Sequence, residues 1–112
     1  MSQDLIHERN RAPMYVIYGY CELFLPYAVT LKDKRMVVRS IIDRLKKRVN
    51  ISIMEIKYQD LWQRSILGFA AVANTDSDIN LVRDAIQSTL DLHHPEADII
   101  KLQFDIIPTI SE

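Results

Sequence analysis

The stretch MYVIYGYCELFLPYAVTLKDKRMVVRSIIDRLKKRV, from Met14 to Val49, contains the signals that decide the fold. Residues 14–25 alternate between two faces and are rich in aromatic and β-branched side chains, which predicts a β-strand that ends at Pro26. Thr30 and Asp33 have the spacing of a capping box, and apolar residues at helical spacing predict a helix from residue 31 to about residue 49. This part of the chain is therefore a β-α unit.

A second unit of the same kind follows. Residues 50–58 predict another strand, with a bulge near Met54, and residues 64–74 predict a third. Thr75 and Asp78 repeat the capping box before a helix that ends near Leu92, and residues 100–106 alternate as a last strand. The order βαββαβ predicts an α+β fold, the ferredoxin-like split βαβ sandwich. Its antiparallel four-stranded sheet has the order 4-1-3-2, with two helices on one face. One core should contain Ile41, Leu45, Ile86 and Phe104.

Length and composition are those of one globular domain. The 112 residues are 48% hydrophobic and 26% charged. We expect a domain over residues 14–107, a flexible extension over residues 1–13 and a short tail over residues 108–112. No apolar run has the length of a membrane span or the character of a signal peptide, which predicts a cytoplasmic protein without a membrane partner.

Several classes of chemistry have no sequence signal. The two glycines, Gly19 and Gly68, lie inside apolar runs, so no phosphate-binding glycine loop is present. The single cysteine excludes disulfide frameworks and paired-cysteine sites. His93, His94, Glu96 and Asp98 match no metal-ligand spacing, and no nucleophile–base pair is evident. We therefore predict a non-enzymatic protein with no cofactor and no metal.

Charge is strongly polarised along the chain, although the net charge is only −1. Residues 32–48 contain eight Lys or Arg and two Asp residues, so the rest of the chain is acidic. A basic helix of this kind can follow a nucleic-acid backbone or an acidic protein surface. A solvated surface without a ligand is the alternative.

The start of the first helix is a second candidate site. The topology brings residues 25–35, 58–64 and 92–98 to one end of the sheet. Lys34 falls within the apolar stripe of the helix and needs a partner there. Its ammonium could extend to solvent or pair with Asp60 or Glu22. Alternatively, Lys34 and Arg35 could bind an anion such as a phosphate, together with helix N–H groups and Gln63 or Arg64.

The sheet face without helices is a third candidate surface. Val16, Tyr18, Tyr20 and Phe24 should form an apolar patch there, which monomers rarely leave bare. A second copy of the chain or another partner is the favoured occupant, ahead of stacked RNA bases. Trp62 and His93 are interpreted as packing residues, although Trp62 could also stack on a base.

With these residues in view, the chain resembles the YlxP-like family, small bacterial proteins with a domain of unknown function. Three segments carry the resemblance, which extends from Met14 to about Ile107: TLKDKR (residues 30–35), NISIMEI (50–56) and QDLWQRSILG (59–68). The chain departs from the family in Tyr27, where glycine is common, and in Tyr18, Gly19 and Tyr20. The resemblance implies a ferredoxin-like fold. It also implies a connection to RNA or the ribosome, since some members are encoded among translation genes.

Together these features predict an accessory protein of translation or ribosome biogenesis that binds RNA or a ribonucleoprotein through a basic helix. The candidate residues for RNA or an anion are Lys32, Lys34, Arg35, Arg39, Lys46, Lys47, Gln63 and Arg64. The alternative is a sheet-mediated homodimer that binds a small anionic metabolite at the start of the first helix.

Overall fold

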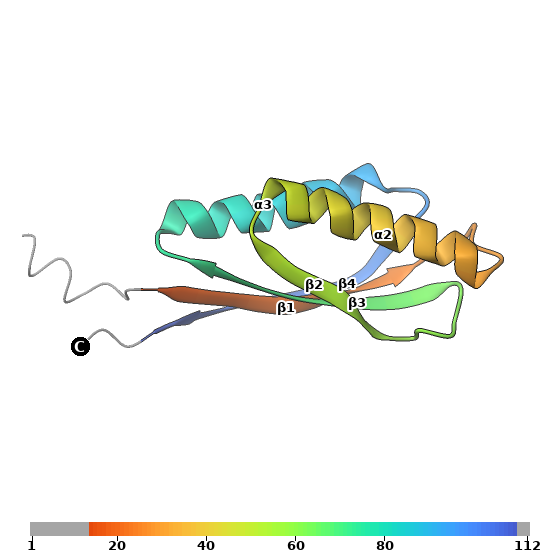
Figure 1. The fold of residues 1–112 in the computed structure, drawn as a ribbon, viewed down its shortest axis with the longest axis horizontal. Helices are drawn as coiled ribbons and strands as arrows, with labels where there is room; N and C mark the ends of the chain where they lie inside the picture. The colour runs from red at the N-terminus through yellow and green to blue at the C-terminus, as the bar shows by residue number, and fades with distance from the viewer. Residues whose placement is uncertain (1–13, 110–112) are drawn as a thin grey trace, which may run out of the picture.

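The computed structural model describes residues 14–109 and contains the six predicted elements in the predicted order (Figure 1). The elements are β1 (Tyr15–Phe24), α2 (Leu31–Arg48), β2 (Ile51–Lys57), β3 (Arg64–Ala73), α3 (Asp76–Leu92) and β4 (Asp98–Pro108). The predicted extension over residues 1–13 lies outside the described residues, as do residues 110–112 of the predicted tail.

The four strands form one antiparallel sheet in the order β2-β3-β1-β4, which confirms the predicted topology. Both helices cover the same face of this sheet, and the other face carries no helix (Figure 1). β1 and β3 are the central strands, whereas β2 and β4 form the two edges. This layout confirms the ferredoxin-like architecture.

Gly19 is required by the close approach of β1 and β4. A Cβ atom on Gly19 would lie 2.0 Å from the carbonyl oxygen of Gln103, a separation that no side chain could occupy. The same contact shows that the Gln103 carbonyl is directed toward β1.

The core lies between the helices and the sheet. Ile41 and Leu45 of α2, together with Ile86 of α3, are at most 2% exposed and belong to one cluster. Phe104 of β4 packs against that cluster, with its ring centroid 6.2 Å from that of Phe69. The prediction that these residues share one core is confirmed.

Each helix begins with the capping box that the sequence indicates. Thr30 Oγ1 accepts a hydrogen bond from the Asp33 N–H, and the Asp33 carboxylate accepts bonds from the N–H groups of Val29 and Thr30. Thr75 and Asp78 repeat this arrangement at α3. Two loops are thereby fixed where they enter their helices.

These caps predict an acid-sensitive part of the stability. Hydrogen bonds from backbone N–H groups, above all those of Val29 and Asn74, lower the pKa values of Asp33 and Asp78 from the ordinary 3.8. A lowered folded-state pKa stabilises the protein above the unfolded-state pKa, and this stabilisation is lost as the pH falls through the folded-state value. We expect wild type to melt above Asp33→Asn/Asp78→Asn at pH 6, with the gap closing as the pH falls below about 4. Thermal unfolding followed by circular dichroism measures this, and a gap that does not change with pH would contradict it.

Three details differ from the sequence prediction. β4 begins at Asp98 and continues to Pro108, so it is longer than the predicted strand at both ends. The register shift in β2 falls between Glu55 and Lys57 rather than near Met54. β4 also contains an extra residue, Ile100, at a register shift opposite Glu22 and Leu23 of β1. Edge strands tolerate such irregularities because only one of their sides is held by a neighbouring strand.

Candidate functional site

Lys34 is the most deeply buried charge in the described part of the chain. Its side chain is 1% exposed, and its Nζ lies 2.9 Å from Glu55 Oε2. Nζ also donates to the carbonyl oxygens of Tyr58 at 2.7 Å and Gln59 at 3.2 Å. The prediction that Lys34 has a partner is therefore confirmed. The predicted partners, Asp60 and Glu22, are wrong. Glu55 occupies that place because its position in β2 faces α2.

The Lys34 ammonium joins α2 to the loop between β2 and β3. That loop turns at Tyr58, which has a φ of 68° and so adopts a left-handed conformation that is uncommon for a side chain of this size. Ser65 of β3 donates to Glu55 at 2.7 Å, so the carboxylate is held from two sides. Lys34 is thus a structural anchor rather than an anion ligand, since its donors face protein oxygens.

Gln63 and Arg64 are also engaged within the protein. Arg64 pairs with Glu22, and its guanidinium lies 4.6 Å from the ring centroid of Tyr58. Gln63 Nε2 donates to the carbonyl of Pro26 at 3.4 Å, and the Gln63 carbonyl accepts from the Leu25 N–H. The structure therefore brings the predicted segments 25–35 and 58–64 together, with Gln63 linking the two and Arg64 held by Glu22 of β1.

The start of α2 already holds a carboxylate. Asp33 accepts hydrogen bonds from the N–H groups at the helix entrance, at 3.0 Å and 3.2 Å. An external anion would meet this negative charge, and the buried Lys34 could not reach it. The geometry thus gives the predicted anion site at the helix start little support.

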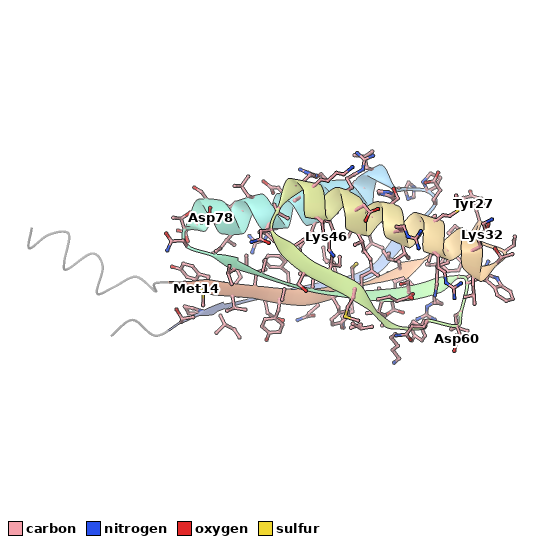
Figure 2. All side chains as sticks on the ribbon, in the orientation of Figure 1. Met14, Tyr27, Lys32, Lys46, Asp60 and Asp78 are labelled. Atoms are coloured by element: carbon pink, nitrogen blue, oxygen red, sulfur yellow. The ribbon has the colours of Figure 1, made fainter. Side chains whose placement is uncertain are left out.

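The outer surface of α2 presents the remaining predicted cations. Arg35, Arg39 and Lys46 follow one another at spacings of four and seven residues, which places them on one side of the helix. We define the basic face by its members, which are all exposed: Lys32, Arg35, Arg39, Lys46 and Lys47. Figure 2 shows Lys32 and Lys46 well apart along α2. None of the five forms an ion pair with another side chain of residues 14–109.

Arg48, the residue that follows Lys47, behaves differently. Its guanidinium turns toward α3 and donates to the Ala85 carbonyl at 3.4 Å and to Thr89 Oγ1 at 3.3 Å. The chain therefore uses one arginine of α2 to join the two helices and leaves the basic face open to a ligand.

The helix-free sheet face has the predicted apolar character. Tyr18 is 42% exposed and Phe24 is 37% exposed, while Val16 and Tyr20 are half-buried. The residues opposite them in β3 include Ala70 and Val72, so the patch extends over both central strands.

His93 makes a contact that the sequence did not indicate. Its Nδ1 bonds to the Thr89 carbonyl at 2.8 Å, and its Nε2 lies 3.0 Å from the Ser40 hydroxyl. Ser40 lies within α2, where backbone N–H groups are already used by the helix, so no donors are positioned for an oxyanion. We interpret the contact as a link between α2 and α3. Only spatial proximity reveals it, because the two residues are far apart in sequence.

The other reactive side chains of the part of the chain that the structure describes include a buried cysteine and a second histidine. Burial raises the pKa of Cys21 to about 12, which leaves its thiol protonated and unreactive. Among residues 14–109, no three His, Cys, Asp or Glu side chains are grouped so that they could hold a metal ion. His94 Nδ1 lies 2.9 Å from Asp98. Trp62 lies within the β2–β3 loop and is 48% exposed rather than covered by the core. Neither α2 nor α3 combines the length and apolar character of a membrane span.

Comparison with known proteins identifies the family. Residues 16–104 match the family described as protein of unknown function, DUF503. The chain belongs to this family. The uncharacterized protein YlxP of Bacillus subtilis (strain 168) is 43% identical over 58 residues, which are 52% of this chain and 63% of that protein. The similar segment thus spans less than two thirds of the relative.

Solved structures of unrelated sequence share the fold. The de novo designed protein Foldit4 has a TM-score of 0.54 at 7% identity, covering 85% of this chain and 98% of its own. SnoaB, a cofactor-independent oxygenase from Streptomyces nogalater, has a TM-score of 0.51 at 6% identity, with coverages of 88% and 95%. A dimeric ferredoxin-like protein of unknown function from Thermobifida fusca YX also reaches 0.51, at 11% identity and coverages of 88% and 93%. At these identities the likeness concerns the fold alone.

Proposed function

We propose that this DUF503 protein binds RNA or a ribonucleoprotein through the basic face of α2. The observation that carries the proposal is the group of five exposed cations without an ion-pair partner among the described residues. A phosphate backbone is the ligand that such a row of cations suits, because each neutralised phosphate releases counterions. The resemblance to YlxP-like proteins encoded among translation genes points in the same direction.

Helix stability does not explain the cations at the start of α2. Lys32 and Arg35 lie near the start of α2, where the helix dipole disfavours cations by about 0.3–1 kcal/mol each. Arg35 and Arg39 are four residues apart on one side of the helix, so they also repel one another. A bound polyanion would relieve both costs. The acidic remainder of the chain would direct that polyanion to α2.

Reversing two charges of the basic face should weaken RNA binding and reduce its dependence on salt. The test compares wild type with Lys46→Glu/Lys47→Glu, using a single-stranded RNA of mixed sequence and purified ribosomal subunits at about 50 and about 200 mM salt. We expect wild-type affinity to fall steeply with salt. The variant should bind more weakly, with a log–log slope reduced by about 1–2.

A control variant separates a local effect from a change in total charge. Lys57→Glu/Arg83→Glu alters the net charge equally but lies outside α2, so its binding and salt slope should stay closer to wild type. The variant Lys32→Glu/Arg35→Glu measures how far the site extends toward the helix start. Absence of salt-dependent binding by wild type, or equal losses in the control and in Lys46→Glu/Lys47→Glu, would contradict the proposal.

The metabolite-binding homodimer has weaker support. Its anion site is occupied by Asp33, and Lys34 is buried against Glu55. Its dimer interface stays a proposal, supported by the exposure of Tyr18 and Phe24 and by the similar protein from Thermobifida fusca that is described as dimeric. A second copy could meet this chain at the sheet face or at a sheet edge. Of these two surfaces, the edge has the sequence pattern that specifies pairing more closely.

A further inference from the structure

β4 is a long edge strand that is poorly protected. It pairs with β1 on one side, and no strand of residues 14–109 pairs with its other side. None of its eleven residues is buried. Ile99, Ile100, Ile106 and Ile107 are between 36% and 52% exposed. An exposed apolar edge of this length invites pairing with another chain, and natural proteins usually cover or interrupt it.

The sequence of this edge is complementary to itself. Residues 99–107 read IIKLQFDII, and reversal about Gln103 preserves the class of every position. Ile99 and Ile100 exchange with Ile107 and Ile106, Leu102 exchanges with Phe104, and Lys101 exchanges with the opposite charge of Asp105. Over the segment from Lys101 to Asp105, two identical strands that run antiparallel about Gln103 would therefore match apolar with apolar and cation with anion.

We propose that a second copy of this chain pairs with β4 through its own β4, antiparallel and about a two-fold axis at Gln103. Lys101 then lies opposite Asp105 of the partner subunit, and the reciprocal pair forms by symmetry. On the helix-covered face, Leu102 meets Phe104 of the partner subunit. The two sheets become one continuous sheet, with the helices of both copies on the same side.

The backbone of β4 is oriented for this pairing. Because the Gln103 carbonyl is directed toward Gly19 of β1, the polar backbone groups of alternate residues, Leu102, Phe104 and Ile106, are directed to the free edge. Leu102 can then exchange both backbone hydrogen bonds with Phe104 of the partner subunit. Lys101 and Asp105 become non-hydrogen-bonded pairs, in which facing side chains lie closest.

The other edge of the sheet lacks these properties. β2 reads ISIMEIK, and reversal about its centre would place Ile51 opposite Lys57 and Ile53 opposite Glu55. A register shift between Glu55 and Lys57 also interrupts it. In β4 the extra residue Ile100 lies outside the segment from Lys101 to Asp105, so the centre of the proposed interface is regular. Self-pairing is thus specific to β4.

Disulfide formation at single positions tests the register. Gln103→Cys should form a disulfide between two copies under mild oxidation, since residue 103 faces its own equivalent across the axis. Lys101→Cys should not, because its equivalent lies about 13 Å further along the strand. A mixture of Lys101→Cys and Asp105→Cys should form the mixed disulfide. Cys21 is 2% exposed and should not form a disulfide between two copies. The wild-type protein is the control for this cysteine.

Exchanging the two charges tests the same register without a covalent bond. Lys101→Asp and Asp105→Lys each place like charges opposite one another, and each should weaken the dimer about tenfold in sedimentation equilibrium. The double variant Lys101→Asp/Asp105→Lys restores opposite charges and should recover wild-type association. Circular dichroism checks that each variant folds.

Two outcomes would overturn the inference. One is a wild-type chain that stays monomeric at high micromolar concentration. The other is a dimer in which Gln103→Cys forms no disulfide and Lys101→Asp/Asp105→Lys does not recover wild-type association. That result is expected if the two copies pack through Tyr18 and Phe24. Neither result depends on RNA binding.

Discussion

Replacing Lys34 with methionine is expected to destabilise the protein by about 3–5 kcal/mol, the range for removing one partner of a buried ion pair. The substitution leaves Glu55 without its cation in a site where its side chain is only 19% exposed. It also removes the donor to the carbonyls of Tyr58 and Gln59. The exposed fraction of Glu55 favours the lower end of the range. Urea unfolding at neutral pH gives the difference in free energy.

Two further variants separate the ion pair from loss of size and charge. Lys32→Met removes an exposed lysine two residues away and should change the free energy of unfolding by no more than about 0.5 kcal/mol. Lys34→Met/Glu55→Gln removes both charges and should recover part of the loss, because no unpaired carboxylate is left. A loss of less than about 1 kcal/mol for Lys34→Met would show that the contact stabilises the protein little.

Lys34 illustrates what the sequence reveals about a site. Its position in the apolar stripe of a helix identifies a buried cation, since periodicity alone determines which face a helical residue occupies. Its partner depends on which strand lies beneath that turn of α2 and on the path of the β2–β3 loop. The sequence predicts a register shift near Met54, just before Glu55, whereas the shift lies just after Glu55. The side of β2 that Glu55 occupies was therefore not predictable. The need for a partner was predictable, and the partner's identity was not.

The same division applies to the fold. The strands, both capping boxes and the strand order follow from local patterns and the handedness of crossovers, and all are confirmed. The ends of β4 do not follow, because Ile99 and Ile107 lie next to Ile100 and Ile106 and so fall outside the alternation that marks a one-sided strand. Those isoleucines make sense as part of an edge that meets another chain. A departure from the local pattern thus coincides with the surface proposed for a second copy.

The residues predicted to bind RNA or an anion fall into two groups in the structure. Lys34, Gln63 and Arg64 can reach protein oxygens at the end of the sheet and are used there. The members of the basic face lie on the outer side of α2 and form no ion pair with the described acidic residues of α3 and β4. Net charge could not distinguish these two groups. Their positions in the fold do.

The second large effect is expected in the core beneath the basic face. Ile41→Ala and Leu45→Ala should each lower the free energy of unfolding by about 2–5 kcal/mol, because each removes a side chain that is at most 1% exposed and leaves a cavity between α2 and the sheet. The loss should fall near the upper end if the rigid sheet prevents the site from closing. Met36→Ala, on the same helix but at a residue 65% exposed, is the matched control and should change stability by no more than about 0.5 kcal/mol.

These core variants also separate stability from RNA binding, because Ile41 and Leu45 lie on the opposite side of α2 from Arg39 and Lys46. At a temperature where Leu45→Ala remains folded, it should bind RNA with the affinity and salt slope of wild type, since the exposed cations keep their spacing. Lys46→Glu/Lys47→Glu should show the reverse, with weakened binding and a smaller loss of stability than Leu45→Ala, because the two lysines lie in the last turn of α2 and interact only with the helix dipole there. Equal stability losses at Leu45 and Met36 would contradict the core assignment. A folded Leu45→Ala that no longer binds would mean that binding depends on the packing of α2 and not on its exposed charges alone.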